Sequence, residues 1–503
     1  MDTAAPNLTP LLLLVAIGLL VWSWRRARAR GRVGILNWLQ GLAFVLPWGM
    51  VFGLSTVGID IGFAGFVLMM VVATAFYIIV GRQARQAAGR ERQRQATRAA
   101  FEPESVVVSD ANPSESAAVQ ERAEPLSAPA QPPTIPAADL AAIESIFSID
   151  TYFLTETVPT REGAIFKGNL RADAAAALEA LSEKLRQVVG DRYQLFLIED
   201  LEQKPAAIVL PERNANLSTS TNEKALVVAM LVASCLTLLE LGANLNGFSL
   251  ISDATRWPEA LPLVAGVLAL LAGREGGLRW MAARYDVRVS PPFVIPSLGI
   301  GTLGGLSRYE TPLPDRKALF DVALAGPLVS AGLSLVLVLL GLLQSGQPAV
   351  ANIGLPTSLF QYSVLVGGLA RSILGAQMQQ EAIAIDPLVA VGWVGLFISA
   401  LGLLPAGQLD GGRIVQAVYG RAMARRTTFA TLGILGIASL ANILALYWAL
   451  VIFTIVRAPE RPPRNEITEV DTPRDIYALL ALLFAALVLL PIPEAIAVRI
   501  GMG

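Results

Sequence analysis

Long runs of apolar residues determine what this chain can fold into. Three runs precede residue 81, at 8–24, 36–55 and 61–80. Seven more follow residue 223, near 224–242, 258–278, 318–344, 358–376, 387–406, 428–456 and 476–493. Each run is long enough to cross, or nearly cross, a hydrocarbon layer roughly 30 Å thick. We therefore predict a polytopic α-helical membrane protein, which agrees with a composition that is 54% hydrophobic and only 16% charged.

Arginine runs predict how the first part of the chain is oriented. The first apolar run is followed by "RRARARGR" at 25–32, and the third by six arginines between 82 and 98. A signal peptide carries its positive charge before the apolar segment, so the first run is expected to be a retained span. Both arginine runs are cytoplasmic if three helices cross from an outside start. Residues 1–99 are thus predicted to form transmembrane helices with arginine-rich flanks.

Two different kinds of segment follow. Residues 100–138 hold seven prolines among Ser, Ala and Glu, which predicts a disordered linker. From 139 to 215 the pattern becomes globular. "DLAAIESIF" and "ADAAAALEALSEKLRQVV" have helical spacing, whereas "AIFKGNL", "YQLFLIED" and "AAIVLP" are typical of short strands. We predict a small soluble α/β domain here, with a recognition or regulatory role.

The remainder, 216–503, is predicted to be a transmembrane core. Within it "PPFVIPSLGIGTLGGL" at 291–306 is apolar but rich in Pro and Gly, which predicts a re-entrant loop. The run at 428–456 fits either one tilted helix or a tight hairpin, so the side of the C-terminus stays open. Arg457, Arg461 and Arg464 are predicted to form a solvated collar at the membrane interface.

The chain contains no histidine. Histidine is the commonest metal ligand and the usual proton shuttle near neutral pH. The sequence alone therefore excludes a histidine general base, a Ser-His pair and a histidine-ligated zinc. The net charge of −1 gives no reason to expect a nucleic-acid partner, and the single cysteine, Cys235, can form no internal disulfide.

Four stretches carry a resemblance to a known family. They are "FSIDTYFLTETVPTREGAIFKGNLR", "PPFVIPSLGIGTLGGLSRYETPLPDRKALFDVALAGP", "LLPAGQLDGGRIVQAVYG" and "NEITEVDTPRDIYALLALLFAALVLLPIP". From about residue 139 to its end, the chain resembles the site-2 protease family (peptidase M50) of intramembrane zinc metalloproteases. Within this family it is similar to the cyanobacterial and chloroplast branch of ethylene-dependent gravitropism-deficient and yellow-green proteins. The resemblance implies a site-2 protease-like transmembrane core.

The family's zinc motif is degenerate in this sequence. In active relatives, H-E-x-x-H puts two imidazoles on one helical face, and the glutamate between them activates the metal-bound water. By resemblance this motif falls on Arg274 to Leu278, so Arg274 and Leu278 stand at the two histidine positions. Glu275 keeps the general-base position, now vestigial, and Asp410 of "LDGG" keeps the carboxylate-ligand position. Zinc serves active family members, but we expect no metal or cofactor here. Three further departures from the family pattern are Asp386, Gly402 and Arg413.

The charges at the degenerate motif have two possible explanations. A charge near the bilayer centre costs on the order of 3 kcal/mol or more unless it is paired or hydrated. Arg274 is therefore expected to have a partner, and the resemblance favours a structural ion pair with Asp410. Glu275 is a poor sole partner, because adjacent helical side chains do not face each other. Alternatively, Arg274, Glu275 and Arg279 all lie at the wet cytoplasmic end of the helix.

These observations predict a catalytically inactive pseudoprotease that binds or regulates membrane proteins or transmembrane segments in the lipid bilayer. An active intramembrane zinc metalloendopeptidase with unorthodox ligands is one alternative, with Asp386, Asp321 or Cys235 as borrowed ligands. A transporter or channel component is another, since buried charges and irregular loops also mark permeation routes. The resemblance implies a plasma or thylakoid membrane.

Overall fold

The structure is a computed structural model that describes residues 135–499, apart from 161, 201–203, 251, 346–352 and 441, and isolated positions between 24 and 83. The predicted spans before residue 81 and most of the predicted linker therefore lie outside the described residues. The chain divides into one unit of residues 1–128 and a second of residues 129–503. The elements described below all belong to the second unit.

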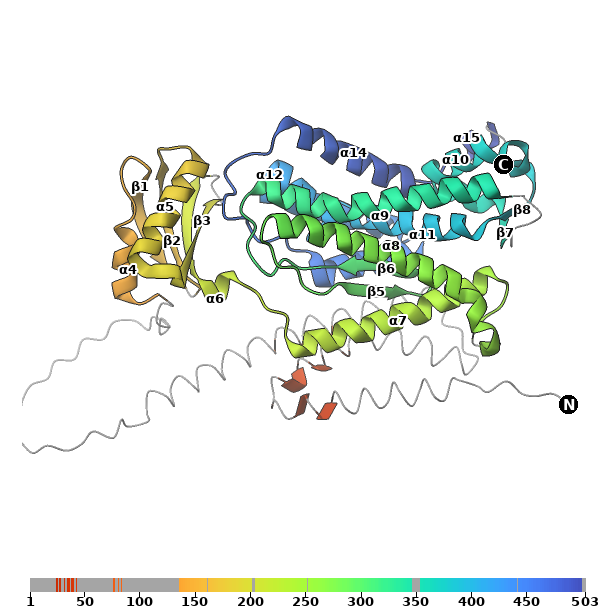
Figure 1. Cartoon of the computed structure of the whole chain (residues 1–503), viewed down its shortest axis with the longest axis horizontal. Coiled ribbons are helices and arrows are strands. Elements are labelled where there is room, and N and C mark those ends of the chain that lie inside the picture. Colours follow the sequence, from red (N-terminus) through yellow and green to blue (C-terminus); the bar gives the residue numbers. More distant parts are fainter. Residues whose placement is uncertain are drawn as a thin grey trace, which may run out of the picture. The chain divides into compact units, whose positions relative to one another are not determined.

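A small α/β domain forms the first part of this unit (Figure 1). Its four strands form an antiparallel sheet in the order β1-β2-β4-β3. Both predicted helices and all three predicted strands are confirmed, while β1 had not been predicted. A bulge between Leu154 and Glu156 interrupts the alternation of β1, which hid its period from the sequence. The elements are α4 (Ala137–Glu144), β1 (Tyr152–Pro159), β2 (Ala164–Leu170), α5 (Ala174–Val189), β3 (Tyr193–Glu199), β4 (Pro205–Pro211) and α6 (Glu212–Ala215).

The sheet of this domain carries apolar side chains on both faces. Asp173 caps the start of helix α5: its carboxylate accepts hydrogen bonds from the Ala175 and Ala176 amides at 3.0 and 3.2 Å. This helix packs Leu181 into the main core of the domain, together with α4. A second, smaller buried cluster contains Phe196 and Ile198. Because β3 alternates between the faces, one sheet contributes to both clusters.

Long helices form the transmembrane core. Four of the described helical segments are long and apolar enough to cross a membrane: Glu223–Leu245, Ala254–Arg284, Arg316–Gln344 and Thr472–Leu489. Predicted spans at these four places are confirmed. Figure 1 shows α8, α9 and α11 side by side, and α8 and α9 pack extensively together. The helices are α7 (Thr221–Leu245), α8 (Trp257–Arg284), α9 (Arg316–Gln344), α10 (Val364–Leu374), α11 (Pro387–Gly402), α12 (Asp410–Ala438), α13 (Ile443–Val451), α14 (Thr472–Leu489) and α15 (Glu494–Arg499).

Three of the remaining apolar runs differ from the simplest prediction. The run at 358–376 contains the 11-residue helix α10, and the run at 387–406 contains the 16-residue α11. The run at 428–456 is a hairpin, because α12 ends at Ala438 and α13 starts at Ile443. Helix α12 begins well before this run, at Asp410, and is broken at Gly420, which has a φ of 82°.

The predicted re-entrant loop at 291–306 is a β-hairpin, so that prediction was wrong about its backbone. Strands β5 (Phe293–Ser297) and β6 (Gly301–Leu306) pair antiparallel and pack against α7. The register shifts between Val294 and Pro296, at a bulge where the missing proline N–H disrupts no regular pairing. Pro and Gly therefore shape this hairpin without preventing it, and its backbone groups pair with each other.

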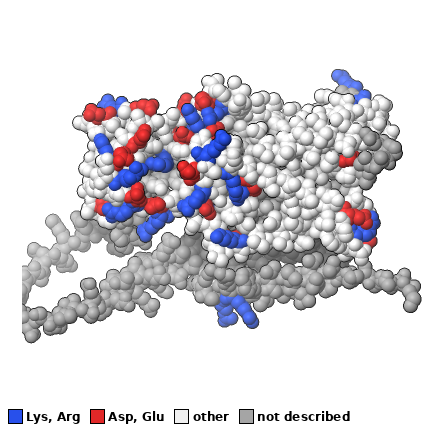
Figure 2. All heavy atoms as spheres, viewed as in Figure 1, with Lys and Arg blue, Asp and Glu red and all other residues white. Residues whose placement is uncertain are grey.

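Charged side chains are distributed unevenly over the surface. On the face seen in Figure 2, Lys, Arg, Asp and Glu gather over the α/β domain and the neighbouring end of the core. The middle of the helical surface is almost free of them, and a few more lie at its opposite end. Large apolar side chains are exposed along α7 and α9, among them Val228, Val232, Leu328 and Leu343. Such a band of apolar surface is what a lipid-facing region requires.

The tail of the core is joined to the α/β domain by main-chain hydrogen bonds. Residues 464–466, called here the joining segment, run parallel to the edge of β3. The Leu197 amide donates to the Arg464 carbonyl at 2.7 Å, and the Glu466 amide donates to the Leu197 carbonyl at 2.9 Å. Arg464 also donates to the Ser182 hydroxyl at 3.1 Å. The prediction of a solvated collar was therefore wrong for Arg464, which binds another domain.

Candidate functional site

Helix α8 places Arg274 and Glu275 inside the core. Its packing against α9 is close, since a Cβ added to Gly326 would lie 3.1 Å from the Arg274 carbonyl oxygen and 3.3 Å from the Arg274 Cγ. A glycine on α9 thus leaves room for the arginine side chain. Arg274 and Glu275 are both buried. Two charged residues at this depth need partners on neighbouring elements.

Arg274 contacts two carboxylates. Its Nη1 donates to Glu275 Oε1 at 2.7 Å, and its Nη2 forms an ion pair with Asp410 Oδ2 at the start of α12. The structure thus brings together Arg274 and Asp410, 136 residues apart in sequence. Glu275 reaches the same guanidinium although the two residues are adjacent on the helix.

Glu275 is held by two further donors. The Ser307 hydroxyl donates to both carboxylate oxygens, at 3.0 and 3.1 Å, and Arg279 forms an ion pair one helical turn away. Arg279 is 40% exposed and also donates to the Ser290 carbonyl, whereas the Arg274 side chain is only 7% exposed. The wet-end explanation therefore suits Arg279 and does not suit Arg274.

Another buried arginine, Arg413 on α12, continues the series of ion pairs beyond Asp410. Arg413 Nη1 lies 3.7 Å from Asp410 Oδ1, and its Nε donates to Glu460 at 2.8 Å. Its Nη2 donates to the Ser307 carbonyl at 2.7 Å, and the guanidinium lies 4.2 Å from the centre of the Tyr309 ring. The sequence had marked Arg413 only as a departure from the family pattern. Glu460 had not been singled out, since a glutamate in the proline-rich "APERPP" carries no sequence signal for burial.

These side chains form a continuous series of alternating charge, called here the ion chain. Three arginines and three carboxylates balance each other, and five of the six residues are buried. Alternation lets each inner charge face an opposite one on both sides, and the terminal Glu460 faces Arg413, which offsets part of the cost of removing these charges from water. In order, the ion chain is Arg279, Glu275, Arg274, Asp410, Arg413 and Glu460.

The other residues marked by the sequence lie in different surroundings. Asp386 caps α11 by accepting from the Leu388 amide at 2.8 Å. Asp321 accepts from Arg474 and from the Tyr285 hydroxyl. Cys235 lies on α7 and is half-buried. Of these marked positions, Gly402 borders the ion chain, because a Cβ there would lie 3.5 Å from Asp410 Oδ2.

The residues that the resemblance places at the family's metal position do not fit zinc. Zinc needs thiolate, imidazole or carboxylate donors. Leu278 offers none, and Arg274 is a permanent cation with donors only. Asp410 is already paired with Arg274 and lies beside Arg413, so a dication next to it would face two guanidinium groups. Within the part of the chain that the structure describes, no three Cys, Asp or Glu side chains are grouped to hold a metal ion.

Comparison with known proteins gives consistent matches. Residues 262–446 match peptidase family M50, and residues 141–217 match the EGY3 middle domain. The chain is 32% identical over 412 residues to "Probable zinc metalloprotease EGY1, chloroplastic" of Arabidopsis thaliana, covering 74% of each protein. It is 31% identical to "Probable zinc metallopeptidase EGY3, chloroplastic" of the same plant over 381 residues, covering 71% of the chain and 66% of EGY3.

A rice relative is matched at higher identity over a shorter region. "Probable zinc metalloprotease EGY2, chloroplastic" of Oryza sativa subsp. indica is 36% identical over 358 residues, which is 70% of this chain and 65% of the relative. The chain therefore spans slightly less than two thirds of that relative's length. No solved structure matches. Together with the helical core, the α/β domain and the span-length helices, these matches show that the chain belongs to peptidase family M50, in the EGY-like branch of the site-2 proteases.

Proposed function

We propose that this M50 homologue is a catalytically inactive pseudoprotease that binds or regulates membrane proteins. The observation that carries the proposal is the guanidinium of Arg274 in contact with both Asp410 and Glu275. It stands at a histidine position of the family motif and engages the two carboxylates that the motif retains. The residues at the family's general-base and carboxylate-ligand positions, Glu275 and Asp410, are members of the ion chain.

The chemistry of the donors supports the loss of activity. A metalloprotease uses its metal to turn bound water into a nucleophile near neutral pH. Arg274 cannot take a proton from water, because a guanidinium stays protonated in proteins. Glu275 accepts hydrogen bonds from Arg274, Arg279 and Ser307, so its lone pairs are directed to the protein.

The rest of the scaffold supports a binding role. The helices of the core pack closely on one another, and the apolar surface along α7 and α9 suits contact with lipid or with a partner's transmembrane segment. Three similar plant proteins bear the word chloroplastic in their names. We therefore propose that the protein resides in a plasma or thylakoid membrane, with other integral membrane proteins as partners.

Metal analysis tests the loss of activity directly. Purified full-length protein is expected to contain far less than one zinc per chain and to leave a transmembrane reporter segment intact. A matched Glu275→Gln variant is expected to behave identically in both assays. Stoichiometric zinc, together with cleavage that a chelator and Glu275→Gln both abolish, would establish an active protease and overturn the proposal.

Restoring the missing donors tests the explanation. The double variant Arg274→His, Leu278→His presents two imidazoles one helical turn apart, with Asp410 as the third ligand. We expect this variant to bind zinc and the single Arg274→His variant to bind much less. If the double variant takes up no zinc, other changes such as Arg413 beside Asp410 also prevent binding.

A further inference from the structure

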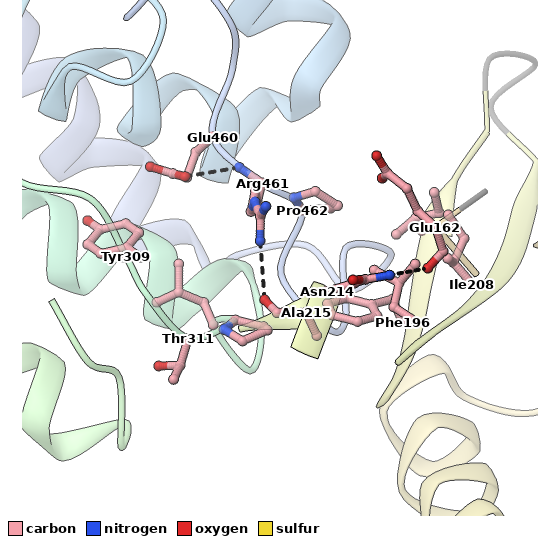
Figure 3. A pocket seen from close by; sticks show the side chains of 14 residues that line it. Glu162, Phe196, Ile208, Asn214, Ala215, Tyr309, Thr311, Glu460, Arg461 and Pro462 are labelled. Carbon is pink, nitrogen blue, oxygen red and sulfur yellow. Dashed lines mark hydrogen bonds between the residues drawn. The ribbon is translucent and has the colours of Figure 1, made fainter. Parts of the chain in front are cut away.

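A pocket of about 210 Å³ lies between the α/β domain and the core (Figure 3). One wall is the sheet face that carries Phe196, Ile208 and Leu210, opposite the face covered by α5. The other wall consists of two loops of the core, 309–313 and 460–462. Most of the lining is apolar, so the pocket suits an apolar group from another molecule.

Two exposed residues of opposite charge line the pocket. Arg461 belongs to the core wall, and Glu162 belongs to the turn between β1 and β2 on the sheet wall (Figure 3). Both residues are exposed. Among the described residues, neither side chain forms an ion pair. The Arg461 guanidinium donates to the Ala215 carbonyl at 3.2 Å, and the Arg461 main-chain amide donates to Glu460 Oε1 at 3.1 Å. The third charge at the pocket, Glu460, is already neutralised by Arg413.

The size of the pocket limits its occupant. Pockets for drug-sized ligands and cofactors measure about 300–1,000 Å³. This smaller pocket accommodates one large side chain and leaves no room for a cofactor or a lipid acyl chain. The two exposed charges on opposite walls favour a ligand that presents an acid toward Arg461 and a base toward Glu162. A short stretch of polypeptide has both properties.

We propose that this pocket binds an extended segment of a partner protein in which one large apolar residue is flanked by a basic and an acidic residue. The apolar side chain fills the space between the sheet and the loops. The acidic neighbour pairs with Arg461, and the basic neighbour pairs with Glu162. This site lies in the α/β domain and its adjoining loops, so it is independent of whether the core cleaves anything.

The pocket is also in contact with the ion chain. Tyr309 and Glu460 line it, and both touch Arg413, at 4.2 Å from the ring centre and 2.8 Å from the carboxylate. The same tail leads from Arg461 into the joining segment on β3. A bound segment would thus contact the α/β domain, the tail and the last member of the ion chain at once, and we expect it to stabilise their association.

Peptide binding to the full-length protein in detergent tests the proposal. The probe is a fluorescent, end-blocked peptide Gly-Lys-Phe-Glu-Gly, followed by fluorescence anisotropy. Replacing Phe by Ala, or Glu by Gln, is expected to weaken binding about tenfold, as loss of a desolvated side chain or a charge-assisted hydrogen bond does. Arg461→Gln and Glu162→Gln should each weaken it similarly. Arg171→Gln, an exposed arginine elsewhere on the same domain, is the matched control and should leave binding unchanged.

A charge reversal separates recognition from misfolding. The variant Glu162→Arg, with both walls positive, is expected to lose the probe and to prefer Gly-Glu-Phe-Glu-Gly, which a misfolded protein cannot do. The proposal is overturned if wild-type protein binds no probe at millimolar concentration, or if Arg461→Gln binds it as well as wild type. It is also overturned if phosphatidylglycerol vesicles displace the probe in an Arg461-dependent way, since the pocket would then recognise lipid headgroups.

Discussion

The α/β domain and the transmembrane core each contain an ion pair between an arginine and a carboxylate, with the arginine exposed in the first and buried in the second. On the domain, Arg192 and Asp139 form an ion pair at 2.9 Å, with the Arg192 side chain 62% exposed. In the core, Arg413 and Glu460 form one at 2.7 Å, with side chains 2% and 7% exposed. The distances are nearly equal. The difference lies in the solvent, which screens the first pair and is excluded from the second.

This comparison shows why the core charges form an ordered series. An exposed ion pair contributes little and can be lost at little cost. A buried charge that loses its partner is costly, because nothing replaces the missing solvation. The core can therefore hold six charged residues only if each has a partner. We therefore expect substitutions in the ion chain to lower the stability of the protein more than substitutions in the exposed ion pair of the α/β domain.

The largest effect is expected for Arg413→Ala. This change leaves the buried Glu460 with no charged partner, only the Arg461 main-chain amide, and removes the donor to the Ser307 carbonyl. Removing one partner of a buried pair destabilises a protein by about 3–5 kcal/mol. We expect low abundance and a strongly lowered thermal unfolding midpoint in detergent. Restoring neutrality with Arg413→Met, Glu460→Met should recover much of the midpoint, and a double variant as unstable as Arg413→Ala would show that charge balance is not the reason.

A smaller loss is expected for Arg274→Ala. Asp410 would then keep only Arg413, at 3.7 Å, while Glu275 would keep Arg279 and Ser307. Since both carboxylates retain a donor nearby, we expect a destabilisation of about 2–3 kcal/mol, below that of Arg413→Ala. Thermal unfolding in the same detergent measures it. Unchanged abundance and stability would show that the Arg274–Asp410 pair contributes nothing, and the two regions would then not differ as argued.

The joining segment links the two regions, and it should show an intermediate effect. Glu466→Pro removes the amide that donates to the Leu197 carbonyl, and such a loss costs about 1–3 kcal/mol when the acceptor stays buried. Faster hydrogen exchange along β3 is the expected result, with the core unaffected. Glu466→Ala keeps the amide and removes only the side chain that pairs with Arg421, so it separates the two contributions. Equal exchange in both variants would mean that the ion pair, and not the main chain, joins the segment to β3.

The sequence predicted the long membrane helices of the core better than its β-hairpin and its buried ion pairs. Hydropathy identified α7, α8, α9 and α14, because a span must be apolar over its whole length. It missed the hairpin at 293–306, whose Pro and Gly are typical of both loops and bulged strands. It also missed Glu460, because an ion pair between residues 47 positions apart follows no periodicity. Family resemblance predicted that Arg274 and Asp410 face each other. That Arg413, Ser307 and Glu460 lie beside them is visible only in the structure.

The smallest effect belongs to the exposed pair and appears as a dependence on pH. Tyr193 donates to Asp139 at 2.6 Å, and this bond is the main cause that lowers the pKa of Asp139 below its ordinary 3.8, with Arg192 adding to it. A carboxyl whose pKa is lowered by folding stabilises the protein above pH 3.8, and this contribution is lost as the pH falls toward the lower pKa. Asp139→Asn should therefore slightly lower stability at neutral pH and leave it unchanged at the most acidic pH, so that the acid side of the stability profile becomes flatter.

The tyrosine provides an independent readout of the same pair at high pH. Burial, and then the hydrogen bond and charge of Asp139, raise the pKa of Tyr193 to about 12. Since folding favours the protonated phenol, its contribution is complete below pH 10 and is lost as the pH rises from 10 to 12. In Asp139→Asn the charge is gone, so the pKa of Tyr193 should fall while burial keeps it above 10. Spectrophotometric titration, with Tyr193→Phe subtracted to isolate this residue, measures the shift. An unchanged pKa of Tyr193 would mean that burial alone raises it and that Asp139 does not affect the tyrosine.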